Sequence, residues 1–471
     1  MSTMNDAPFW TLDRVAQALE ARATGDLPRG PSGLTGISTD TRAIAPGNCF
    51  LALAGERFDA HDFLDQAVAS GAAALVVSRA PRAGTLTIPV YVVDDTLLAL
   101  GDLARYRRRA WARRVVGVAG SNGKTSTKEL LAGALGSTFT VHATRGNLNN
   151  RIGVPLTLLA IPDAADVAII ELGTSIPGEI AMLRSIAEPD VAVVTSIAEE
   201  HLEGFGSLEG VLREESEAVR DVACAVIPSH EPALESIARR TARSVVTAGL
   251  DAGDVHASSW HLADDGSGVA VVDGVTVHSP LRGVHNARNM LLAIAVAHEL
   301  GVSTEAAARG IARLTPPSMR SSWERMGDSL VINDAYNSNP GSALAALEML
   351  AAAPGDVKVA VLGTMRELGD SAQRCHDDVA RAAIASDARV IAGLGDFADA
   401  FVRVAPDDPR VVTAPDVDEL WRVLEPRLAP GATILLKASR GVRLERILPH
   451  LTSWATSASD SHTDSRSPSA C

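Results

Sequence analysis

The hydrophobic positions of the chain fall into short runs that are separated by longer amphipathic stretches. Runs at 48–53 and 73–77 predict two strands near the N-terminus, with a helical stretch between them. From 115 to about 314, apolar runs alternate with helical patterns, which predicts a parallel sheet with helices on its faces. We expect the clearest strands of this region at 167–171 and 191–195, and an edge hairpin at 269–277.

A second alternating unit follows a break in this pattern. Thr315, Pro316 and Pro317 interrupt the helical periodicity and mark a domain boundary. Beyond this boundary, four further apolar runs predict strands at 330–333, 357–362, 390–392 and 432–437. From about 457 the chain is rich in Ser, Asp and Thr with almost no apolar content, so a disordered tail is expected at 457–471.

A glycine-rich stretch from Gly117 to Thr125 lies between an apolar run at 115–119 and a helical pattern at 126–135. A turn between a strand and a helix directs backbone N–H groups and the positive helix end at one spot, which suits a polyphosphate. Lys124 would reach the terminal phosphates and Thr125 would hold a magnesium ion through its hydroxyl. The predicted nucleotide-binding residues of this loop are Gly120, Asn122, Gly123, Lys124, Thr125 and Ser126.

Length, composition and charge describe an ordinary globular protein of several domains. The 471 residues suggest roughly three domains, which we place at 1–110, 111–314 and 315–456. Hydrophobic residues make up 46% and charged residues 21% of the chain, as in typical globular proteins. The net charge of −14 argues against a nucleic-acid surface, and the basic segment at 105–114 is interpreted as a solvated helix end.

Cysteine spacing and apolar run lengths bear on the compartment. Cys49, Cys224, Cys375 and Cys471 are widely scattered without metal-ligand spacing, so we expect reduced thiols. No run reaches the ~18 apolar residues that a membrane-spanning helix needs, and the N-terminus lacks the pattern of a signal peptide. We therefore expect a cytoplasmic protein without membrane insertion.

Two polar residues lie at or beyond the ends of predicted central strands, where an open parallel sheet places its ligand site. Glu171 ends the run at 167–171, so its carboxylate is expected near Thr125 and the magnesium ion. His201 follows the strand that ends at Thr195. On position alone, His201 is either a hydrogen-bonding surface residue or a functional one.

Several motifs in the chain resemble those of the Mur ligase family, particularly its members that add D-alanyl-D-alanine. The phosphate loop has its first glycine one residue earlier than usual, at Gly117, as in Mur ligases and folylpolyglutamate synthases. The sequence Gly-Asn-x-Asn-Asn-x-Ile-Gly-x-Pro at 146–155 and the Lys-x-Ser-Arg sequence at 437–440 resemble family motifs. Two further segments, at 38–42 and 55–63, resemble the family's uridine-nucleotide-binding motifs. Three more similar segments lie at 201–207, 285–289 and 334–340.

This resemblance implies an α/β fold of three domains and an ATP-dependent reaction. It implies a UDP-binding N-terminal domain, a central P-loop parallel-sheet ATPase and a Rossmann-like C-terminal domain. ATP would phosphorylate the terminal carboxylate of UDP-N-acetylmuramoyl-tripeptide, and the amine of D-alanyl-D-alanine would displace the phosphate. The implied cofactors are ATP and Mg²⁺, and the implied protein is a cytoplasmic monomer of peptidoglycan precursor synthesis.

The resemblance also implies roles for individual residues. Lys124 would stabilise charge on the transferring phosphoryl group, while Thr125, Glu171 and His201 would hold magnesium. Asn289 would contact adenine, and Arg320 and Asp334 would reach phosphate and ribose after domain closure. The implied substrate-binding residues are Ser38, Thr41, Arg42, Asn147, Asn149, Asn150, Tyr336, Asn337, Lys437, Ser439 and Arg440.

One departure from the family pattern affects the expected chemistry. Most Mur ligases carry a lysine that carbon dioxide carbamylates to give a metal-binding anion, but Glu215 stands at that position here. The Glu215 carboxyl carbon lies three bonds closer to the backbone than a carbamate carbon, a deficit of about 3–4 Å. Either Glu215 supplies a permanent carboxylate, which predicts a ligase independent of bicarbonate, or the anion is lost and the protein is impaired.

The other departures are smaller. Ser196 stands where the family pattern has asparagine, Glu200 where it has alanine, and Met319 where it has glycine. Asn333 and Thr364 each stand where the pattern has aspartate. Rival functions are another Mur ligase or a folylpolyglutamate synthase, and a catalytically impaired nucleotide-binding homologue. The motif at 146–155 and the uridine motifs argue against folylpolyglutamate synthase, and the acidic balance argues against a nucleic-acid-dependent ATPase.

Overall fold

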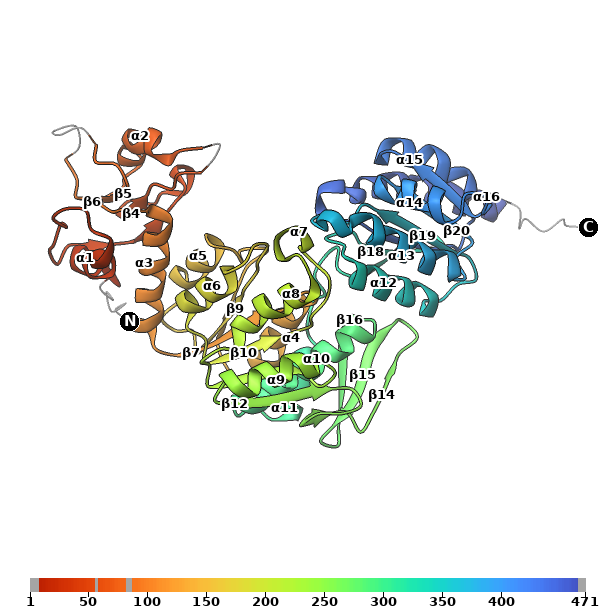
Figure 1. Cartoon of the computed structure of the whole chain (residues 1–471), viewed down its shortest axis with the longest axis horizontal. Coiled ribbons are helices and arrows are strands. Elements are labelled where there is room, and N and C mark those ends of the chain that lie inside the picture. The colour runs from red at the N-terminus through yellow and green to blue at the C-terminus, as the bar shows by residue number, and fades with distance from the viewer. Residues whose placement is uncertain (1–7, 56–57, 82–86, 465–471) are drawn as a thin grey trace, which may run out of the picture. The chain divides into compact units, whose positions relative to one another are not determined.

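The computed structural model describes residues 8–55, 58–81 and 87–464. The chain divides into two compact units. Unit 1 comprises Met1–Gly117, His142–Leu172 and Ala181–Pro189, and unit 2 comprises Val118–Val141, Gly173–Ile180 and Asp190–Cys471. In Figure 1 the colour runs from red at the N-terminus to blue at the C-terminus.

The N-terminal part of unit 1 is built on a parallel four-stranded sheet (red and orange in Figure 1). The strands pair in sequence order: β3 (Gly36–Ser38), β4 (Asn48–Leu51), β5 (Ala74–Val77) and β6 (Val90–Val92). β4 and β5 confirm the two predicted strands, and both are buried along their length because apolar clusters cover both faces of the sheet. The remaining elements here are β1 (Trp10–Thr11), β2 (Gly33–Leu34), α1 (Leu12–Leu19), α2 (Leu64–Ala69) and α3 (Thr96–Trp111).

The basic segment at the end of α3 is helical as predicted, but it is not solvated throughout. Arg107 and Arg108 are buried. Arg107 donates to the Ile161 carbonyl at 2.7 Å, and Arg108 donates to the Ala187 carbonyl at 3.0 Å. These arginines cap carbonyl groups at or near the ends of other helices of unit 1, so they are structural residues. The expectation of a solvated helix end is wrong for these two side chains.

The middle region contains a seven-stranded sheet in the order β13-β12-β11-β10-β7-β9-β8, in which the pairings among β10 to β13 are parallel. The strands are β7 (Arg114–Ala119), β8 (Val141–Ala143), β9 (Val167–Glu171), β10 (Val191–Val194), β11 (Cys224–Pro228), β12 (Ser244–Gly249) and β13 (Val255–His256). β9 and β10 confirm the predicted strands at 167–171 and 191–195. The helices of this region are α4 (Lys124–Gly136), α5 (Gly153–Leu159), α6 (Glu179–Ala187), α7 (Leu202–Phe205), α8 (Leu208–Glu215), α9 (Pro232–Thr241), α10 (Val284–Glu299) and α11 (Thr304–Ile311).

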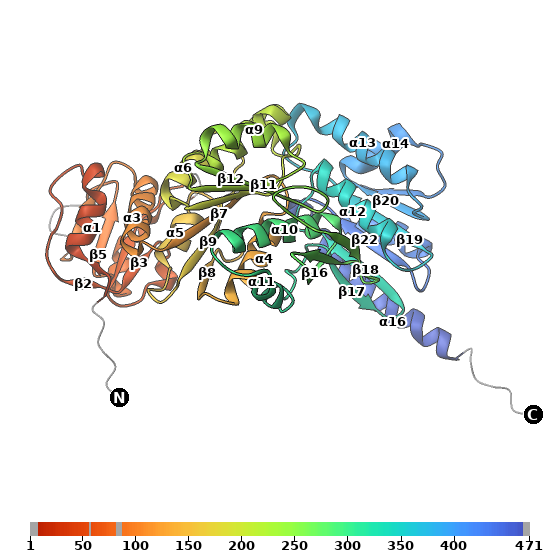
Figure 2. The ribbon, with the colours of Figure 1, turned by 90° about the horizontal axis from the view of Figure 1, so that it is seen from below.

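Within unit 2, α4 packs against α10 and α11 (Figure 2). A separate antiparallel sheet contains β14 (Ser259–Leu262), β15 (Ser267–Val272) and β16 (Val275–Arg282). The predicted hairpin at 269–277 is confirmed, with Asp273 and Gly274 at positive φ in a two-residue turn. The hairpin belongs to this separate antiparallel sheet, in which β15 is the middle strand. It therefore does not lie at the edge of the parallel sheet.

The C-terminal region of unit 2 is a six-stranded sheet in the order β17-β18-β22-β19-β20-β21. The strands are β17 (Ser322–Met326), β18 (Ser329–Asp334), β19 (Lys358–Gly363), β20 (Val390–Leu394), β21 (Val411–Ala414) and β22 (Thr433–Lys437). All pairs are parallel except β17–β18, and the four predicted strands correspond to β18, β19, β20 and β22. The helices are α12 (Pro340–Ala352), α13 (Ala372–Ala385), α14 (Asp396–Val404), α15 (Val417–Leu424) and α16 (Leu448–Asp464).

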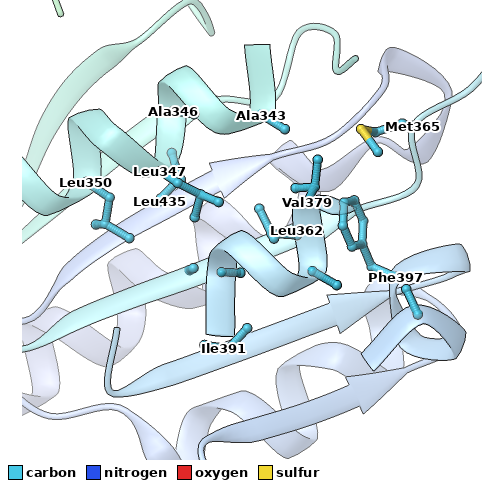
Figure 3. Packing of buried hydrophobic residues seen from close by; sticks show 14 of the residues in the cluster. Ala343, Ala346, Leu347, Leu350, Leu362, Met365, Val379, Ile391, Phe397 and Leu435 are labelled. Carbon is cyan, nitrogen blue, oxygen red and sulfur yellow. The ribbon is translucent and has the colours of Figure 1, made fainter. Parts of the chain in front are cut away.

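Apolar side chains fill both faces of this sheet. On one face, Leu347 of α12, Val379 of α13 and Phe397 of α14 pack over Leu362 and Leu435 of the strands (Figure 3). A second cluster, which includes Leu420 of α15 and Leu451 of α16, covers the other face. A parallel sheet buried on both faces confirms the α/β class predicted for this region.

The C-terminal tail differs in part from its prediction. Helix α16 continues to Asp464, so the chain is helical over 457–464, where disorder was expected. Extending an existing helix avoids the cost of a new nucleation step. Residues 465–471 lie outside the described residues.

Two findings concern the expected compartment. Cys49, Cys224 and Cys375 are buried free thiols, while Cys471 lies outside the described residues. Among the helices that the structure describes, none combines the length and the apolar character needed to cross a membrane.

Candidate active site

The phosphate loop at 120–123 joins β7 to α4, and two of its glycines are required by its backbone. Gly120 has φ +115° and Gly123 has φ +84°, both in the region that favours glycine. A Cβ atom on Gly120 would lie 2.4 Å from the Thr195 hydroxyl oxygen, and one on Gly123 would lie 2.6 Å from the Asn289 side-chain nitrogen. The loop therefore needs glycine at both positions for its conformation and for its close neighbours.

The segment that follows β10 holds this loop through hydrogen bonds. The Thr195 hydroxyl donates to the Asn122 carbonyl at 2.5 Å, and the Asn122 N–H donates to the Ser196 hydroxyl at 3.0 Å. The Ser121 N–H donates to the Ser196 carbonyl at 2.9 Å. Sequence reasoning did not identify Thr195 and Ser196 as part of the site, although their place at the carboxyl end of a parallel strand was a usable signal.

Lys124, Thr125 and Ser126 form the first turn of α4. Thr125 and Ser126 are buried, and the backbone N–H groups of this turn face the loop as the sequence predicts. The Lys124 ammonium donates to the Gly120 carbonyl and, at 3.3 Å, to the Ser121 carbonyl. The ammonium group of Lys124, the predicted phosphate-binding cation, thus contacts the backbone of the phosphate loop.

Two buried carboxylates lie beside Lys124. Glu215, at the end of α8, accepts the Gly120 N–H through Oε2 at 2.6 Å. Glu200 places its Oε1 3.8 Å from the Lys124 Nζ. Glu215 was predicted as a site residue, whereas Glu200 was identified only as a departure from the family pattern.

The electrostatics of these carboxylates follow from their burial. Burial raises the pKa of Glu215 to about 7, Lys124 opposes this shift, and Glu200 adds to it. Burial also raises the pKa of Glu200, against the lowering effects of Lys124 and His201. In the part of the chain that the structure describes, the second oxygen of Glu215, Oε1, is buried without a hydrogen-bond partner.

His201 lies immediately before α7 and contacts a residue from the C-terminal region. Its backbone is left-handed (φ +47°), and its Nδ1 lies 2.5 Å from the Glu367 carboxylate. Burial alone would lower the pKa of His201, but the hydrogen bond with Glu367 and the charge of Glu200 raise it. Glu367 was not predicted as a site residue, although it lies three residues after Thr364, one of the departures from the family pattern.

The side-chain amide of Asn339, in the C-terminal region, contacts the phosphate loop directly. Asn339 is the N-cap of α12 and accepts the Ser342 N–H at 2.9 Å. Its side-chain Nδ2 donates to the Asn122 Oδ1 at 2.9 Å. Sequence reasoning named Asn122 as a site residue but not Asn339, although Asn339 lies in the 334–340 segment that resembles a family motif. Asn289, predicted to touch adenine, is buried on α10 beside Gly123.

The predicted C-terminal site residues gather at the carboxyl ends of β18 and β22. Asp334, which is half-buried, and Lys437, which is buried, form an ion pair at 2.6 Å, and Lys437 also donates to the Asn337 carbonyl at 2.7 Å. The Arg320 guanidinium lies 4.0 Å from the centre of the Tyr336 ring, a cation–π contact. The structure therefore brings these five predicted residues into one neighbourhood.

The last two predicted substrate-binding residues differ in exposure. Ser439 is buried and accepts the Arg366 N–H at 2.9 Å, so its hydroxyl serves the fold. Arg440 is exposed and pairs with Glu445 at 2.8 Å. Met319 is in the left-handed region (φ +59°), where the resemblance implies a glycine, so this turn carries backbone strain.

The two lost aspartates are replaced by side chains with hydrogen-bonding roles in the fold. Asn333 accepts the Ala335 N–H through Oδ1 at 3.3 Å, and Thr364 accepts the Asp396 N–H at 3.0 Å. Neither residue supplies the acidic group that the family motif implies.

The predicted residues of unit 1 form two groups. In the first, Glu171 is buried at the end of β9 and accepts the Asn149 side-chain amide at 2.9 Å. Asn150 accepts the Gly153 N–H at 2.9 Å at the start of α5, and Asn147 is exposed. Asn149 and Glu171 are thus brought together, whereas Asn150 caps a helix.

The second group of unit 1 lies at the end of β3. Ser38 is buried, and its hydroxyl donates to the Asp40 carbonyl at 3.1 Å. Arg42 is exposed and makes two hydrogen bonds to Asp40, at 2.9 and 2.8 Å. Thr41 begins the short helical turn between them. The predicted uridine-nucleotide residues therefore share the carboxyl end of a parallel strand, a common ligand position.

The donor set at the loop suits a magnesium ion held together with a nucleotide. Magnesium prefers oxygen ligands and is commonly bound by one or two carboxylates plus substrate phosphates. The residues near the loop offer the Thr125 hydroxyl at the start of α4 and the buried Oε1 of Glu215 at the end of α8. No group of three or more His, Cys, Asp or Glu side chains within 8–55, 58–81 and 87–464 is arranged to hold a metal. The residues therefore fit a shared site rather than an all-protein cage.

Comparisons with known proteins assign the three parts of the chain to one family. Residues 33–108 match the Mur ligase family catalytic domain, 118–297 the Mur ligase middle domain, and 319–440 the Mur ligase glutamate ligase domain. The UDP-N-acetylmuramoyl-tripeptide–D-alanyl-D-alanine ligase of Escherichia coli is 37% identical over 90% of this chain and 95% of its own. The ligase of the same name from Bacillus subtilis is 35% identical over 88% of this chain and 93% of its own.

Solved structures agree with these sequence matches. MurF from Acinetobacter baumannii superposes with a TM-score of 0.86 and 32% identity, over 94% of this chain and 99% of its own. MurF from Thermotoga maritima in complex with ADP gives a TM-score of 0.80 and 27% identity, over 89% of this chain and 98% of its own. A folylpolyglutamate synthase from Mycobacterium tuberculosis, at 20% identity and a TM-score of 0.61, shares the fold.

Proposed function

The chain belongs to the Mur ligase family, and we propose that it joins D-alanyl-D-alanine to UDP-N-acetylmuramoyl-tripeptide in peptidoglycan precursor synthesis, using ATP. One observation carries this proposal. The Lys124 phosphate loop lies in a chain that is 37% identical, over 90% of its length, to a ligase named for that reaction. The ADP complex of the Thermotoga maritima relative supports the use of ATP.

The proposed reaction has two steps. First, a carboxylate oxygen of the tripeptide attacks the γ-phosphorus of ATP, the bond to ADP breaks, and an acyl phosphate forms. Second, the amine of D-alanyl-D-alanine attacks the acyl carbon, inorganic phosphate leaves with the bonding electrons, and the amine loses a proton. Both steps build up negative charge on phosphoryl oxygens, which Lys124 and the N-terminus of α4 are placed to stabilise.

The chain's other loop residues would orient the nucleotide. Asn289 lies beside Gly123 and would contact the base, while the hydrogen bonds that Asn122 makes with Thr195 and Ser196 would hold the loop in place for phosphate. Thr125, with Glu171 and His201, would hold a magnesium ion, which supplies charge neutralisation between the nucleotide phosphates and the attacking carboxylate. Glu215 would provide a carboxylate at the loop that needs no carbon dioxide to form.

The C-terminal residues would complete the site. Arg320 and Asp334 would contact phosphate and ribose, and this requires Arg320 to leave the Tyr336 ring. Tyr336, Asn337, Lys437, Ser439 and Arg440 would line the acceptor side, and Ser38, Thr41, Arg42, Asn147, Asn149 and Asn150 would bind the UDP-linked substrate. Domain closure would bring these groups to the nucleotide.

A second candidate function is a catalytically impaired nucleotide-binding homologue. One observation favours it: Glu215 accepts the Gly120 N–H, a loop donor of the kind that binds phosphate elsewhere. The two candidates differ in a single respect, because both bind nucleotide but only the ligase turns it over.

The proposed compartment and assembly follow from the same chemistry. Three buried free thiols suit a reducing compartment, so we place the enzyme in the cytoplasm. We also propose that it acts as a monomer of three domains at 1–110, 111–314 and 315–456. Cell fractionation and size-exclusion chromatography with light scattering check these two points.

The direct test is product formation from purified protein. ATP is supplied with D-alanyl-D-alanine and a UDP-N-acetylmuramoyl-tripeptide that has diaminopimelate or lysine as its third residue, and the pentapeptide is detected by mass spectrometry. We expect product only when all three substrates are present, and none with Lys124→Met. Product from free glutamate in place of the dipeptide, or no product from any acceptor, would overturn the proposal.

A further inference from the structure

The buried carboxylate of Glu200 has no role in the mechanism above. Glu200 is buried in the loop that follows β10, between the phosphate loop and His201. Its Oε1 lies 3.8 Å from the Lys124 Nζ, and its Oε2 lies 3.9 Å from the His201 Nε2. A buried carboxylate costs free energy unless it is paired, so its position beside these two groups calls for a physical explanation.

The contacts of Glu200 with Lys124 and His201 are electrostatic. Both distances are longer than a hydrogen bond, and among the groups that the structure describes Oε1 of Glu200 has no hydrogen-bond partner, although a hydrogen bond with Ser121 lowers the pKa of this carboxyl group. By contrast, the neighbouring Glu214 accepts two backbone N–H groups, from Gly178 at 2.7 Å and Ile180 at 2.8 Å, and so holds a loop in place. Glu200 therefore acts through its charge on Lys124.

Lys124 also lies near a second buried carboxylate. Glu215 faces the same lysine and is bonded to Gly120, so two acidic side chains adjoin one ammonium group. Phosphates of a bound nucleotide would add further negative charge at this point. They would have to draw Lys124 from the Gly120 and Ser121 carbonyls and from Glu200.

We propose that Glu200 is a positioning residue that competes with nucleotide phosphates for Lys124 and thereby speeds the release of ADP. Its carboxylate lies 3.8 Å from the Lys124 Nζ, so its charge would oppose phosphate binding at this lysine and would attract the lysine back when the γ-phosphoryl group has been transferred. The inference rests on the proposed function only in assuming that ATP binds at this loop. It concerns Glu200, which stands where the resemblance implies alanine.

The test compares ADP binding by wild type, Glu200→Ala and Glu200→Gln at pH 8 with a fluorescent ADP analogue in stopped flow. We expect both variants to bind about tenfold more tightly, mainly through slower dissociation, because each removes one negative charge beside the phosphates. Glu199→Gln is the matched control. Glu199 is the adjacent carboxylate and pairs with Arg374 at 2.7 Å, so its loss is expected to leave ADP binding unchanged.

The outcomes separate this inference from the proposed function. Tighter binding in both variants supports it, and a purely structural role of Glu200 would not produce such a gain. Unchanged or weaker binding in Glu200→Gln, with a wild-type thermal unfolding midpoint, overturns it while the ligase proposal stands. If the wild type binds no ADP, the ATP site itself fails, and both proposals fall with it.

Discussion

Two lysines, Lys437 at the end of β22 and Lys124 at the start of α4, are held in different ways. Lys437 is buried 2.6 Å from Asp334 and donates to the Asn337 carbonyl at 2.7 Å, so one cation meets one anion in a short, closed pair. Lys124 rests on two loop carbonyls, with Glu200 at 3.8 Å and Glu215 nearby.

This difference separates a cation whose charge is already balanced by a short ion pair from a cation that can move onto the phosphates of a ligand. A closed buried pair is strongly destabilised when one partner is lost, because the other charge remains without compensation. A lysine shared among carbonyls and longer ion pairs can transfer to phosphate at a smaller cost. We therefore expect changes at Lys124 to affect catalysis and changes at the Asp334–Lys437 pair to affect stability.

The largest expected effect is on catalysis. Lys124→Met should lower kcat/KM for ATP by about 10³-fold or more, because it removes the cation that stabilises the transferring phosphoryl group. The measurement is coupled phosphate release with both substrates, together with thermal unfolding. A loss of folding instead of activity would place Lys124 in the same class as Lys437 and break the comparison.

The next effect is on stability. Asp334→Asn should lower the free energy of unfolding by about 3 kcal/mol, since Lys437 would keep its buried charge without its partner. Chemical denaturation followed by circular dichroism measures this change. Glu419→Gln, which removes the exposed pair with Arg422, serves as the control and should cause no measurable change. Equal stability of Asp334→Asn and wild type would contradict the closed-pair description.

A third prediction concerns pH and Glu215. Burial raises the pKa of Glu215 to about 7, above its value of about 4.5 in an unfolded chain, while Lys124 and the Gly120 N–H oppose the shift and Glu200 and Glu214 add to it. The folded state then binds the proton more tightly, so this group's contribution to stability falls as pH rises from about 4.5 through about 7.

In the Glu215→Gln variant the side chain at this position cannot ionise, so the variant does not lose this contribution to stability as pH rises. Relative to wild type, its free energy of unfolding should therefore rise by on the order of 2 kcal/mol between pH 5 and pH 8. Denaturant titrations at several pH values measure the difference between the two proteins. A difference that stays constant with pH would show that Glu215 ionises in the folded chain as it does in the unfolded one.

The smallest effect should come from the contact between Asn339 and Asn122. Asn339→Asp keeps the oxygen that caps α12 but removes the Nδ2 donor to the Asn122 Oδ1. We expect a few-fold rise in KM for ATP, equivalent to about 1 kcal/mol, with little change in stability. Steady-state kinetics and thermal unfolding together check this expectation, and a KM equal to that of wild type would exclude a role for Asn339 in positioning the loop.

Local patterns in the sequence were enough to predict much of the fold. The phosphate loop and the strands β4, β5, β9, β10, β18, β19, β20 and β22 were found because periodicity, glycine placement and apolar runs act over a few residues. Family motifs then located Asp334, Tyr336 and Lys437, which lie together in the structure.

Features that depend on distant contacts could not be found in this way. Arg107 and Arg108 belong to a charge run that looks solvated, yet carbonyl groups from other parts of unit 1 bury them. The place of Glu200 beside Lys124, and of Glu367 beside His201, arises from loops that are far apart or uninformative in sequence. Pairing of this kind is set by tertiary packing, which a linear pattern does not record.

The central claim is that this chain is a D-alanyl-D-alanine-adding ligase whose own carboxylates serve its phosphate loop. The most direct measurement is phosphate release from ATP in carbon-dioxide-depleted buffer, with UDP-N-acetylmuramoyl-tripeptide and with or without D-alanyl-D-alanine. We predict release that requires both substrates and does not increase when bicarbonate is added. Release that appears only with bicarbonate would contradict the role of Glu215, and no release under either condition would contradict the ligase itself.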